Sequence, residues 1–218
     1  MPKYSLPTYD EEAALISRGF KLVAGVDEAG AGCWAGPVFA GAVIFDHDAV
    51  SRLNRPDFDW TLIRDSKTLS PAQRQKAAAV IKTTAVAWAV GTASAAEIDR
   101  INIRQAAALA MTRAIQALTT APQFVIIDFF NLPKLGIPNK GILYGDAKSL
   151  TIAAASIMAK TERDAHLERL AEQYPGYGLE KHKGYGTKEH QEALRKLGPC
   201  AEHRMTYRPV MAVTANVT

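Results

Sequence analysis

The chain has 218 residues and a formal net charge of +4 at pH 7, from 26 Lys and Arg against 22 Asp and Glu. Hydrophobic residues make up 48% and charged residues 22%, which excludes a disordered or fibrous protein and fits an ordinary globular one. This length suits one large domain, with or without a small appendage. A chain of this size buries enough surface to fold without a stabilising disulfide or metal ion.

The cysteines and the start of the chain indicate a cytoplasmic protein. Cys33 and Cys200 are too few for a secreted disulfide framework and lack metal-ligand spacing. Residues 1–15 carry acids where a signal peptide has its apolar core, and no stretch approaches the roughly 18 apolar residues that span a bilayer. The pI of about 9.0 permits a nucleic-acid partner, although attraction to phosphate depends on where the charges cluster.

The first 93 residues predict strands and one capped helix. An apolar run ends abruptly at Asp27 and Glu28, which indicates a buried strand with carboxylates at its end. Ser70, Pro71 and Gln73 match the N-cap, first-turn proline and capping box of a helix start. In chain order we predict a strand at 21–26, a strand at 38–45, loop at 46–69, a helix from 71 to about 82 and a strand at 85–93.

The rest of the chain alternates helices with short strands. A second capping box, from Ser94 to Glu97, predicts one long helix. Apolar strands run into Asp128 and, less clearly, toward Asp146. We predict that long helix with Ile98, Ile101, Leu109 and Ile115 facing the core, strands at 124–127 and 141–144, a helix from 148 to about 173 with a buried first half, and a last helix at 187–198. The expected class is therefore α/β with a mixed sheet.

Three acidic sites share one property, since each follows an apolar strand: Asp27-Glu28, Asp128 and Asp146. In open α/β sheets the ends of neighbouring strands converge on one crevice. Carboxylates crowded there repel one another unless a cation neutralises them, and hard oxygen ligands suit Mg²⁺ or Mn²⁺. The ordinary alternative is that each aspartate caps a turn, and the residues by themselves leave both interpretations open.

Two further motifs concern phosphate binding. Residues 30–35 match the dinucleotide pattern G-x-G-x-x-G/A, but Pro37 and a β-rich run follow where that pattern requires a helix, which excludes a nicotinamide site. Residues 181–190 concentrate three Lys and two His around Tyr185, a composition that suits phosphate and sugar contacts as well as a solvated loop. Lys67 is a weaker candidate for a phosphate contact. P-loop, zincin and α/β-hydrolase motifs do not occur.

Five long motifs, in order and spacing, resemble the bacterial ribonuclease HII family over about residues 20–210. They are VAGVDEAGAGCWAGPVFAGAVI, DSKTLS, IDRINIRQAAALAM, GDAKSLTIAAASIMAK and YPGYGLEKHKGYGTKEHQEAL. The resemblance implies an α/β ribonuclease H-like fold, with a central mixed β-sheet flanked by helices and a small helical C-terminal extension. We expect one domain over 1–218, with its core at about 20–175 and the extension at about 176–210.

The resemblance also implies an activity and a cofactor. It implies a metal-dependent endonuclease that cuts the RNA strand of RNA–DNA hybrids and nicks 5′ of single ribonucleotides in duplex DNA, for ribonucleotide excision repair and RNA primer removal. Two Mg²⁺ or Mn²⁺ ions would act in the active complex. The implied partners are these nucleic acids and a sliding clamp, with a monomeric enzyme and no membrane.

The family's functional residues fall on named positions of this chain. The four metal-binding, catalytic carboxylates fall on Asp27, Glu28, Asp128 and Asp146, the acids already selected by strand position. The family's junction-sensing tyrosine falls on Tyr185, and phosphate contacts fall on Lys67, Lys183 and Lys160. The loop that embraces the ribonucleotide falls on Gly30, Ala31 and Gly32.

This chain departs from the family pattern at two positions. Ala31 stands where the family usually has the arginine of Gly-Arg-Gly, so the loop's backbone groups remain but one guanidinium contact to phosphate is absent. Phe129 follows Asp128 where the family commonly has glycine, and its ring would either narrow the groove or pack beneath it. We expect weaker substrate binding or reduced junction preference, with hydrolysis retained.

Two other functions compete with this interpretation. One is another nuclease of the same fold, such as a resolvase or the type HIII enzyme, which usually carries an additional N-terminal domain. The other is a catalytically silent binder of RNA–DNA hybrids. The retained acids argue against a silent binder, because unused clustered carboxylates would only repel the phosphates of the substrate.

Overall fold

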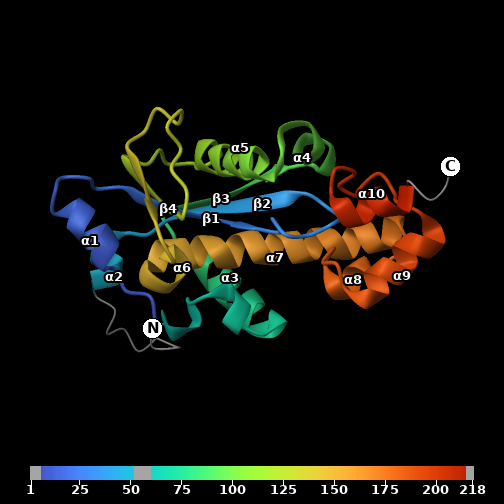
Figure 1. Cartoon of the computed structure of the whole chain (residues 1–218). Helices are drawn as coiled ribbons and strands as arrows, with labels where there is room; N and C mark the ends of the chain where they lie inside the picture. Colours follow the sequence, from blue (N-terminus) through green and yellow to red (C-terminus); the bar gives the residue numbers. More distant parts are fainter. Residues whose placement is uncertain (1–5, 52–59, 215–218) are drawn as a thin grey trace.

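A five-stranded mixed sheet forms the centre of the computed structural model, which describes residues 6–51 and 60–214 (Figure 1). The strand order is β3-β2-β1-β4-β5. β1 pairs antiparallel with β2 and parallel with β4, while β3 joins β2 antiparallel and β5 joins β4 parallel. The strands are β1 (Val23–Ala29), β2 (Val38–Ile44), β3 (Ala87–Ala93), β4 (Phe124–Asp128) and β5 (Asn139–Ile142). The mixed sheet predicted from the sequence is confirmed.

Helices cover both faces of this sheet (Figure 1). α5 and α4 cover one face, and α7 crosses the other with α3 packed against it. The helices are α1 (Asp10–Ile16), α2 (His47–Ser51), α3 (Pro71–Thr84), α4 (Ala95–Ile101), α5 (Ile103–Gln116), α6 (Gly145–Lys148), α7 (Leu150–Gln173), α8 (Leu179–His182), α9 (Lys188–Leu197) and α10 (Arg208–Thr214), with 3-10 turns at Trp60–Leu62 and Ser66–Thr68. None of the described helices is long and apolar enough to cross a membrane.

Small residues let α7 lie directly on the sheet. A side chain at Gly25 would collide with the backbone of Thr151, and one at Gly41 with the carbonyl oxygen of Ala155. The first half of α7 is rich in alanine and wholly buried, as the sequence predicts. Helix and strands therefore approach more closely than larger side chains would permit, which brings residues of α7 next to the C-terminal end of β1.

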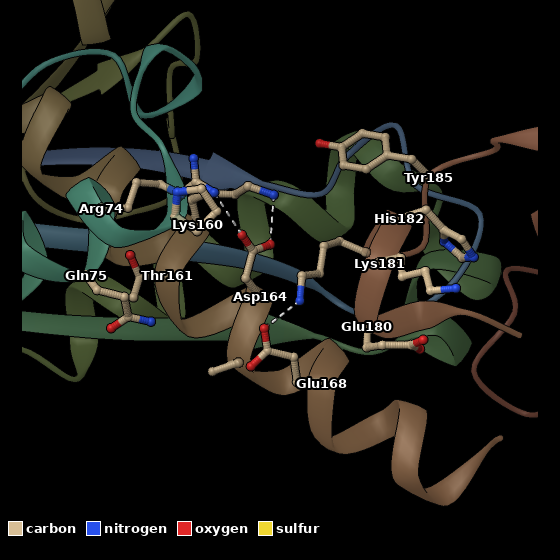
Figure 2. A pocket seen from close by; sticks show the side chains of 13 residues that line it. Arg74, Gln75, Lys160, Thr161, Asp164, Glu168, Glu180, Lys181, His182 and Tyr185 are labelled. Atoms are coloured by element: carbon tan, nitrogen blue, oxygen red, sulfur yellow. Dashed lines mark hydrogen bonds and ion pairs between the residues drawn. The ribbon is translucent and has the colours of Figure 1, made fainter.

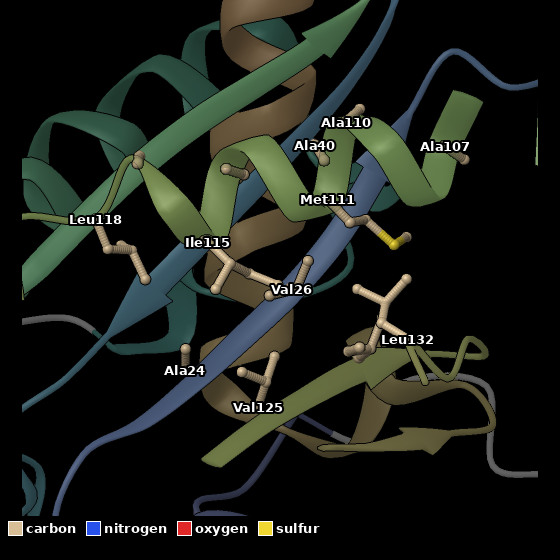
Figure 3. Close-up of a cluster of buried hydrophobic side chains, with 14 of the residues drawn as sticks. Ala24, Val26, Ala40, Ala107, Ala110, Met111, Ile115, Leu118, Val125 and Leu132 are labelled. Atoms are coloured by element: carbon tan, nitrogen blue, oxygen red, sulfur yellow. The ribbon is translucent and has the colours of Figure 1, made fainter. Parts of the chain in front are cut away.

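On the opposite face, the core fills the space between the sheet and α5. Figure 3 shows Val26 of β1 and Val125 of β4 facing Met111 and Ile115 of α5. All four side chains are buried. On α5, apolar residues recur at helical spacing and so face the sheet. β1 and β4 are parallel neighbours with near-continuous apolar runs, as is usual for strands covered on both faces.

The last helices form a small extension beyond the end of α7 (Figure 1). Leu167 and Leu170 of α7 pack with Tyr177 and Leu179 and with Ala35 from the loop after β1. The extension thus shares a core with that loop, so residues far apart in the sequence are held together at this end of the sheet. Cys33 and Cys200 both lie here and are free thiols.

The predicted long helix after Ser94 is wrong in one respect, because it is two helices. The capping box from Ser94 to Glu97 is present, but α4 ends at Asn102, whose φ of +65° breaks the helical path. The side chain of Asn102 then accepts a hydrogen bond from the N–H of Gln105 and starts α5. Asparagine is a good N-cap residue and tolerates positive φ. The spacing of apolar residues alone does not reveal such a break in a helix.

Other boundaries also differ from prediction. β1 extends through Ala29, so its two acids lie within the strand. The short strand predicted at 141–144 lies at Asn139–Ile142. The helix predicted from 148 is α7, which begins at Leu150, and the short helix α6 precedes it. The loop predicted at 46–69 contains α2 and two 3-10 turns, while residues 52–59 lie outside the described residues.

Replacing Gly41 by alanine tests the close packing of α7. We expect Gly41→Ala to lower the free energy of unfolding by about 1–3 kcal/mol, because the new methyl group meets backbone atoms of α7 that cannot rotate away. Gly32→Ala is the matched control, since its methyl group would meet no atom within 4 Å. Urea unfolding measures both, and equal stability of the two variants would contradict the packing argument.

Candidate functional site

Four acidic side chains meet at one edge of the sheet. Asp27 and Glu28 lie near the end of β1, where they pair with Gly41 and Ala40 of β2. Asp128 is the last residue of β4. Because β1 and β4 are parallel neighbours, their C-terminal ends lie at the same edge. Asp146, in the short helix α6, completes the group, so the structure brings together the acids that the sequence selected.

The carboxyl groups interact strongly with one another. Asp27 is 4% exposed, and its burial, followed by the charges of Glu28, Asp128 and Asp146, raises its pKa well above the usual range. Burial and Asp128 likewise raise the pKa of Glu28, and burial raises that of Asp128. Partly or fully buried acids that raise one another's pKa are unfavourable without a neutralising positive charge.

Lys67 supplies part of that positive charge. Its Nζ lies 3.5 Å from Oδ2 of Asp146. Although burial opposes the effect, Asp146, Asp27 and Asp65 raise the pKa of Lys67. The lysine side chain is 78% exposed, so one mobile cation faces four acids. The local charge remains strongly negative.

The donor chemistry of this edge fits a divalent cation. Carboxylate oxygens are the ligands that Mg²⁺ and Mn²⁺ prefer, and a bound cation would relieve the repulsion that raises the pKa of Asp27. Within residues 6–51 and 60–214, however, no three His, Cys, Asp or Glu side chains already form a cluster that could hold a metal ion. The role of all four acids as metal ligands therefore stays a prediction.

Hydrogen bonds fix the orientation of two of these acids. Oδ1 of Asp27 accepts from the N–H of Glu28 at 2.7 Å, and Oδ1 of Asp128 accepts from the N–H of Gly145 at 2.7 Å. Ser156 of α7 lies near enough to the Asp27 carboxyl group to lower its pKa, and its hydroxyl lies 2.9 Å from that of Ser66. Sequence patterns contain no signal for Ser156, because its partners come from β1 and from the turn after residue 65.

A cavity of about 490 Å³ lies between α3, α7 and α8 (Figure 2). Its lining is slightly basic, with one arginine and three lysines against three acids. Lys160 Nζ lies 2.7 Å from Oδ1 of Asp164 and 5.7 Å from the ring centroid of Tyr185. Lys183 Nζ lies 2.6 Å from Oε1 of Glu168. The ring of Tyr185 is partly exposed at the rim, and Arg74 lines the far side.

Arg74 connects the cavity to the acids. Its guanidinium donates to the carbonyl oxygen of Ser66 at 3.0 Å and lies 3.4 Å from Oδ2 of Asp164. Ser66 in turn contacts Ser156, which lies near Asp27. The predicted contact residues Lys160, Lys183 and Tyr185 line this one cavity, while Lys67 lies beside Asp146, one of the four acids.

Two buried arginines hold the loop from Gly30 to Pro37, and sequence analysis missed both. Arg163 donates to the carbonyl oxygens of Pro37, Ala35 and Lys183. Arg204 donates to those of Gly30, Ala31 and Gly36. Both side chains are fully buried, and neither forms an ion pair within the described part of the chain.

This bonding determines which way the predicted contact loop faces. Because the carbonyl groups of Gly30 and Ala31 point inward to Arg204, the peptide groups between them are fixed in orientation. Gly30 has a φ of +92°, and a side chain there would collide with Arg163, so glycine is required at this position. The predicted loop of Gly30, Ala31 and Gly32 is thus rigid and directly follows the acids of β1.

Phe129 lies on the surface and does not pack beneath the groove. Its side chain is 69% exposed, and its φ is +61°. Positive φ is costly for a large side chain, which explains why glycine suits this position better. Exposed Leu143 and Tyr144 lie on the neighbouring segment after β5, so the edge beside Asp128 is apolar.

Comparisons with known proteins agree with the geometry. The family model described as Ribonuclease HII matches residues 24–212. Ribonuclease HII of Anaeromyxobacter sp. (strain Fw109-5) is 51% identical over 199 residues, which cover 91% of this chain and 60% of that protein. Ribonuclease HII of Nitrosococcus oceani is 49% identical over 188 residues, 86% of this chain and 89% of that protein.

Solved structures of ribonuclease H2 and ribonuclease HII have a fold similar to that of this chain. The crystal structure of ribonuclease H2 from Pyrococcus horikoshii OT3 has a TM-score of 0.74 and 26% identity, covering 89% of this chain and 98% of that one. In the PCNA:RNase HII complex from Archaeoglobus fulgidus, the matching chain has a TM-score of 0.70 and 26% identity, covering 88% and 96%. The ribonuclease H-like fold expected from the sequence is confirmed.

Replacing Asp27 by asparagine tests the repulsion among the acids. A carboxyl group whose pKa is raised on folding stabilises the fold below its unfolded pKa and loses that contribution as pH rises through the raised value. In EDTA at pH 8 we expect Asp27→Asn to be at least about 1 kcal/mol more stable than the original protein.

The pH dependence provides the control for this prediction. As the pH rises from about 5 to about 8, the free energy of unfolding of the original protein should fall more than that of Asp27→Asn. Glu172→Gln, at an exposed position of α7, should change neither the stability at pH 8 nor its dependence on pH. A lower stability of Asp27→Asn at pH 8 in EDTA would contradict the repulsion argument.

Proposed function

The chain belongs to the ribonuclease HII family, and on that premise we propose that it cuts the RNA strand of RNA–DNA hybrids and nicks 5′ of single ribonucleotides in duplex DNA. Family membership makes it a metal-dependent endoribonuclease. The observation that carries the finer proposal is the group of four interacting acids, together with the slightly basic cavity rimmed by Tyr185. Ribonucleotide excision repair and primer removal are the processes that need this cut.

The acids are assigned to hydrolysis. Asp27, Glu28, Asp128 and Asp146 would hold two divalent cations, Mg²⁺ or Mn²⁺. When bound, such cations supply an activated water and stabilisation of the departing 3′ oxygen, so the products carry 3′-hydroxyl and 5′-phosphate ends. The chain itself keeps the ligands oriented, through the bonds from the Glu28 N–H to Asp27 and from the Gly145 N–H to Asp128.

The neighbouring surface is assigned to recognition. Tyr185 would stack on the deoxyribose that follows the ribonucleotide, and Lys67, Lys160 and Lys183 would contact phosphates. The rigid loop at Gly30, Ala31 and Gly32 would embrace the ribonucleotide, whose 2′-hydroxyl distinguishes RNA from DNA. The ion pairs of Lys160 and Lys183 hold their ammonium groups at the rim of the cavity.

The competing functions are less well supported. The match to the ribonuclease HII model argues against the type HIII enzyme and a resolvase. A silent binder would have no use for four acids that repel each other and the substrate. The A. fulgidus protein is described in complex with PCNA, so we keep a sliding clamp as a partner of this chain, which we expect to act as a monomer.

The central test is cleavage of duplex DNA that contains one ribonucleotide, with Mg²⁺ or Mn²⁺. We expect a single nick 5′ of the ribonucleotide, and a loss of roughly 100-fold or more in rate for Asp128→Asn, since a metal ion contributes several kcal/mol to the transition state. Glu172→Gln should cut like the original protein. No nick by the original protein would overturn the proposal, and binding without a nick would favour the silent binder.

A second test restores the absent arginine. We expect Ala31→Arg to bind the junction substrate roughly 10-fold or more tightly, because a charge-assisted hydrogen bond to phosphate contributes about 1.5–3 kcal/mol. Ala31→Gln, of similar length without charge, is the control and should have a smaller effect. Unchanged affinity and unchanged junction cleavage in Ala31→Arg would contradict the account of this loop.

A further inference from the structure

Three histidines lie stacked inside the C-terminal extension, and hydrolysis as described above uses none of them. His190 is 0% exposed, His203 1% and His182 8%. The rings of His182 and His190 stack with centroids 4.4 Å apart, and Nε2 of His190 lies 3.1 Å from Nε2 of His203. None of the three forms an ion pair within the described residues.

The backbone determines which nitrogen of each ring carries the proton. The N–H of Cys200 lies 3.0 Å from Nδ1 of His203, and because an amide N–H only donates, that nitrogen accepts. The proton of neutral His203 is therefore on Nε2, which donates to Nε2 of His190. His190 then carries its own proton on Nδ1, which lies 3.0 Å from the carbonyl oxygen of Tyr185 and donates to it.

The third histidine follows the same logic. The N–H of Gly184 donates to Nδ1 of His182 at 3.2 Å, so Nε2 of His182 donates to the carbonyl oxygen of Tyr177 at 2.7 Å. Burial first, and then the neighbouring rings, lowers the pKa of His203 to about 4, and burial also lowers that of His190. In this pattern each ring uses one nitrogen as a donor and the other as an acceptor, which corresponds to the neutral imidazole.

The hydrogen bonds form one directed chain from Cys200 to Tyr185. His190 holds the carbonyl of Tyr185, while the carbonyl of His182 accepts from the N–H of Tyr185 at 2.9 Å. The ring of His190 and the N–H of Thr187 thus share the carbonyl oxygen of Tyr185, and a backbone turn holds its N–H. The ring of Tyr185 extends from that fixed backbone to the rim of the basic cavity (Figure 2).

We propose that His203 and His190 are positioning residues, which act through this chain of hydrogen bonds to hold Tyr185 where its ring meets the substrate sugar. The inference rests on the proposed function, in which Tyr185 recognises the junction. It assigns a role to His190, from the segment 181–190, and to His203, from the C-terminal extension. The C-terminal extension is then part of substrate recognition.

Two variants of His203 distinguish loss of its hydrogen bond to His190 from loss of the imidazole ring itself. His203→Gln places an amide N–H near the position of Nε2 and keeps a donor to His190. His203→Asn offers its oxygen to the Cys200 N–H near the position of Nδ1 but leaves His190 without a donor. We expect His203→Asn to bind the single-ribonucleotide duplex about 3- to 10-fold more weakly, with kcat on a long hybrid nearly unchanged, and His203→Gln to resemble the original protein.

A double-mutant cycle with Tyr185→Ala excludes a merely structural role. If the histidine acts through Tyr185, then adding His203→Asn to Tyr185→Ala has no further effect on junction binding. Additive effects, equal impairment of His203→Gln and His203→Asn, or no effect of Tyr185→Ala would each overturn the proposal. Thermal unfolding of every variant checks that it is folded.

A direct measurement keeps the proposal testable even if a variant fails to fold. Nitrogen-15 NMR of the histidine rings should show His203 protonated on Nε2 and His190 on Nδ1 at pH 7. The opposite tautomers would overturn the relay. Absence of any cleavage by the original protein, with these tautomers present, would instead overturn the proposed function and leave the hydrogen-bond chain standing.

Discussion

The close contact between α7 and the sheet is the constraint on which the rest of the structure depends. Gly25 and Gly41 leave no side chain between the strands and the helix backbone. The helix therefore passes near the acids of β1 and continues to the extension, so that Ser156, Lys160 and Arg163 occur in order along it. Ser156 lies near Asp27, Lys160 lies over Tyr185, and Arg163 bonds the loop after β1. One rigid helix thus sets the spacing between the acids and the recognition surface.

The two buried arginines show how the chain stabilises an irregular loop close to a polyanion. A carboxylate partner would neutralise each guanidinium, but it would also add negative charge beside acids that already repel one another. Arg163 and Arg204 instead bond to backbone carbonyl oxygens, whose dipoles satisfy the donors without cancelling the charge. Their positive charge remains beneath the loop, where in the proposed function it would favour the approach of phosphate groups.

Histidine and arginine therefore have complementary roles in the extension. Arg204 holds the loop that begins at Gly30, and its neighbour His203 begins the hydrogen bonds that reach Tyr185. The two adjacent residues thus bond to different segments, one to His190 and the other to the loop after β1. A segment near the end of the chain in this way fixes both the loop and the tyrosine, and buried neutral histidines serve this purpose because each ring offers one donor and one acceptor in a fixed direction.

Local patterns in the sequence determined much of this protein. Apolar runs marked four of the strands, the capping boxes at Ser70 and Ser94 marked helix starts, and acids at strand ends selected Asp27, Glu28, Asp128 and Asp146. Local interactions suffice for these features, because a cap or a strand depends on residues a few positions apart. The long motifs added the family and with it the fold.

Only the tertiary structure decided the features that depend on contacts between distant residues. The break at Asn102, the exposed and left-handed Phe129 and the division of α6 from α7 follow from packing that no hydrophobic period records. Arg163, Arg204 and the histidine relay bond to backbone groups up to 174 positions away. A carbonyl oxygen or amide N–H is present at almost every residue, so the sequence cannot show which one a buried side chain will find, and the folded chain alone selects it.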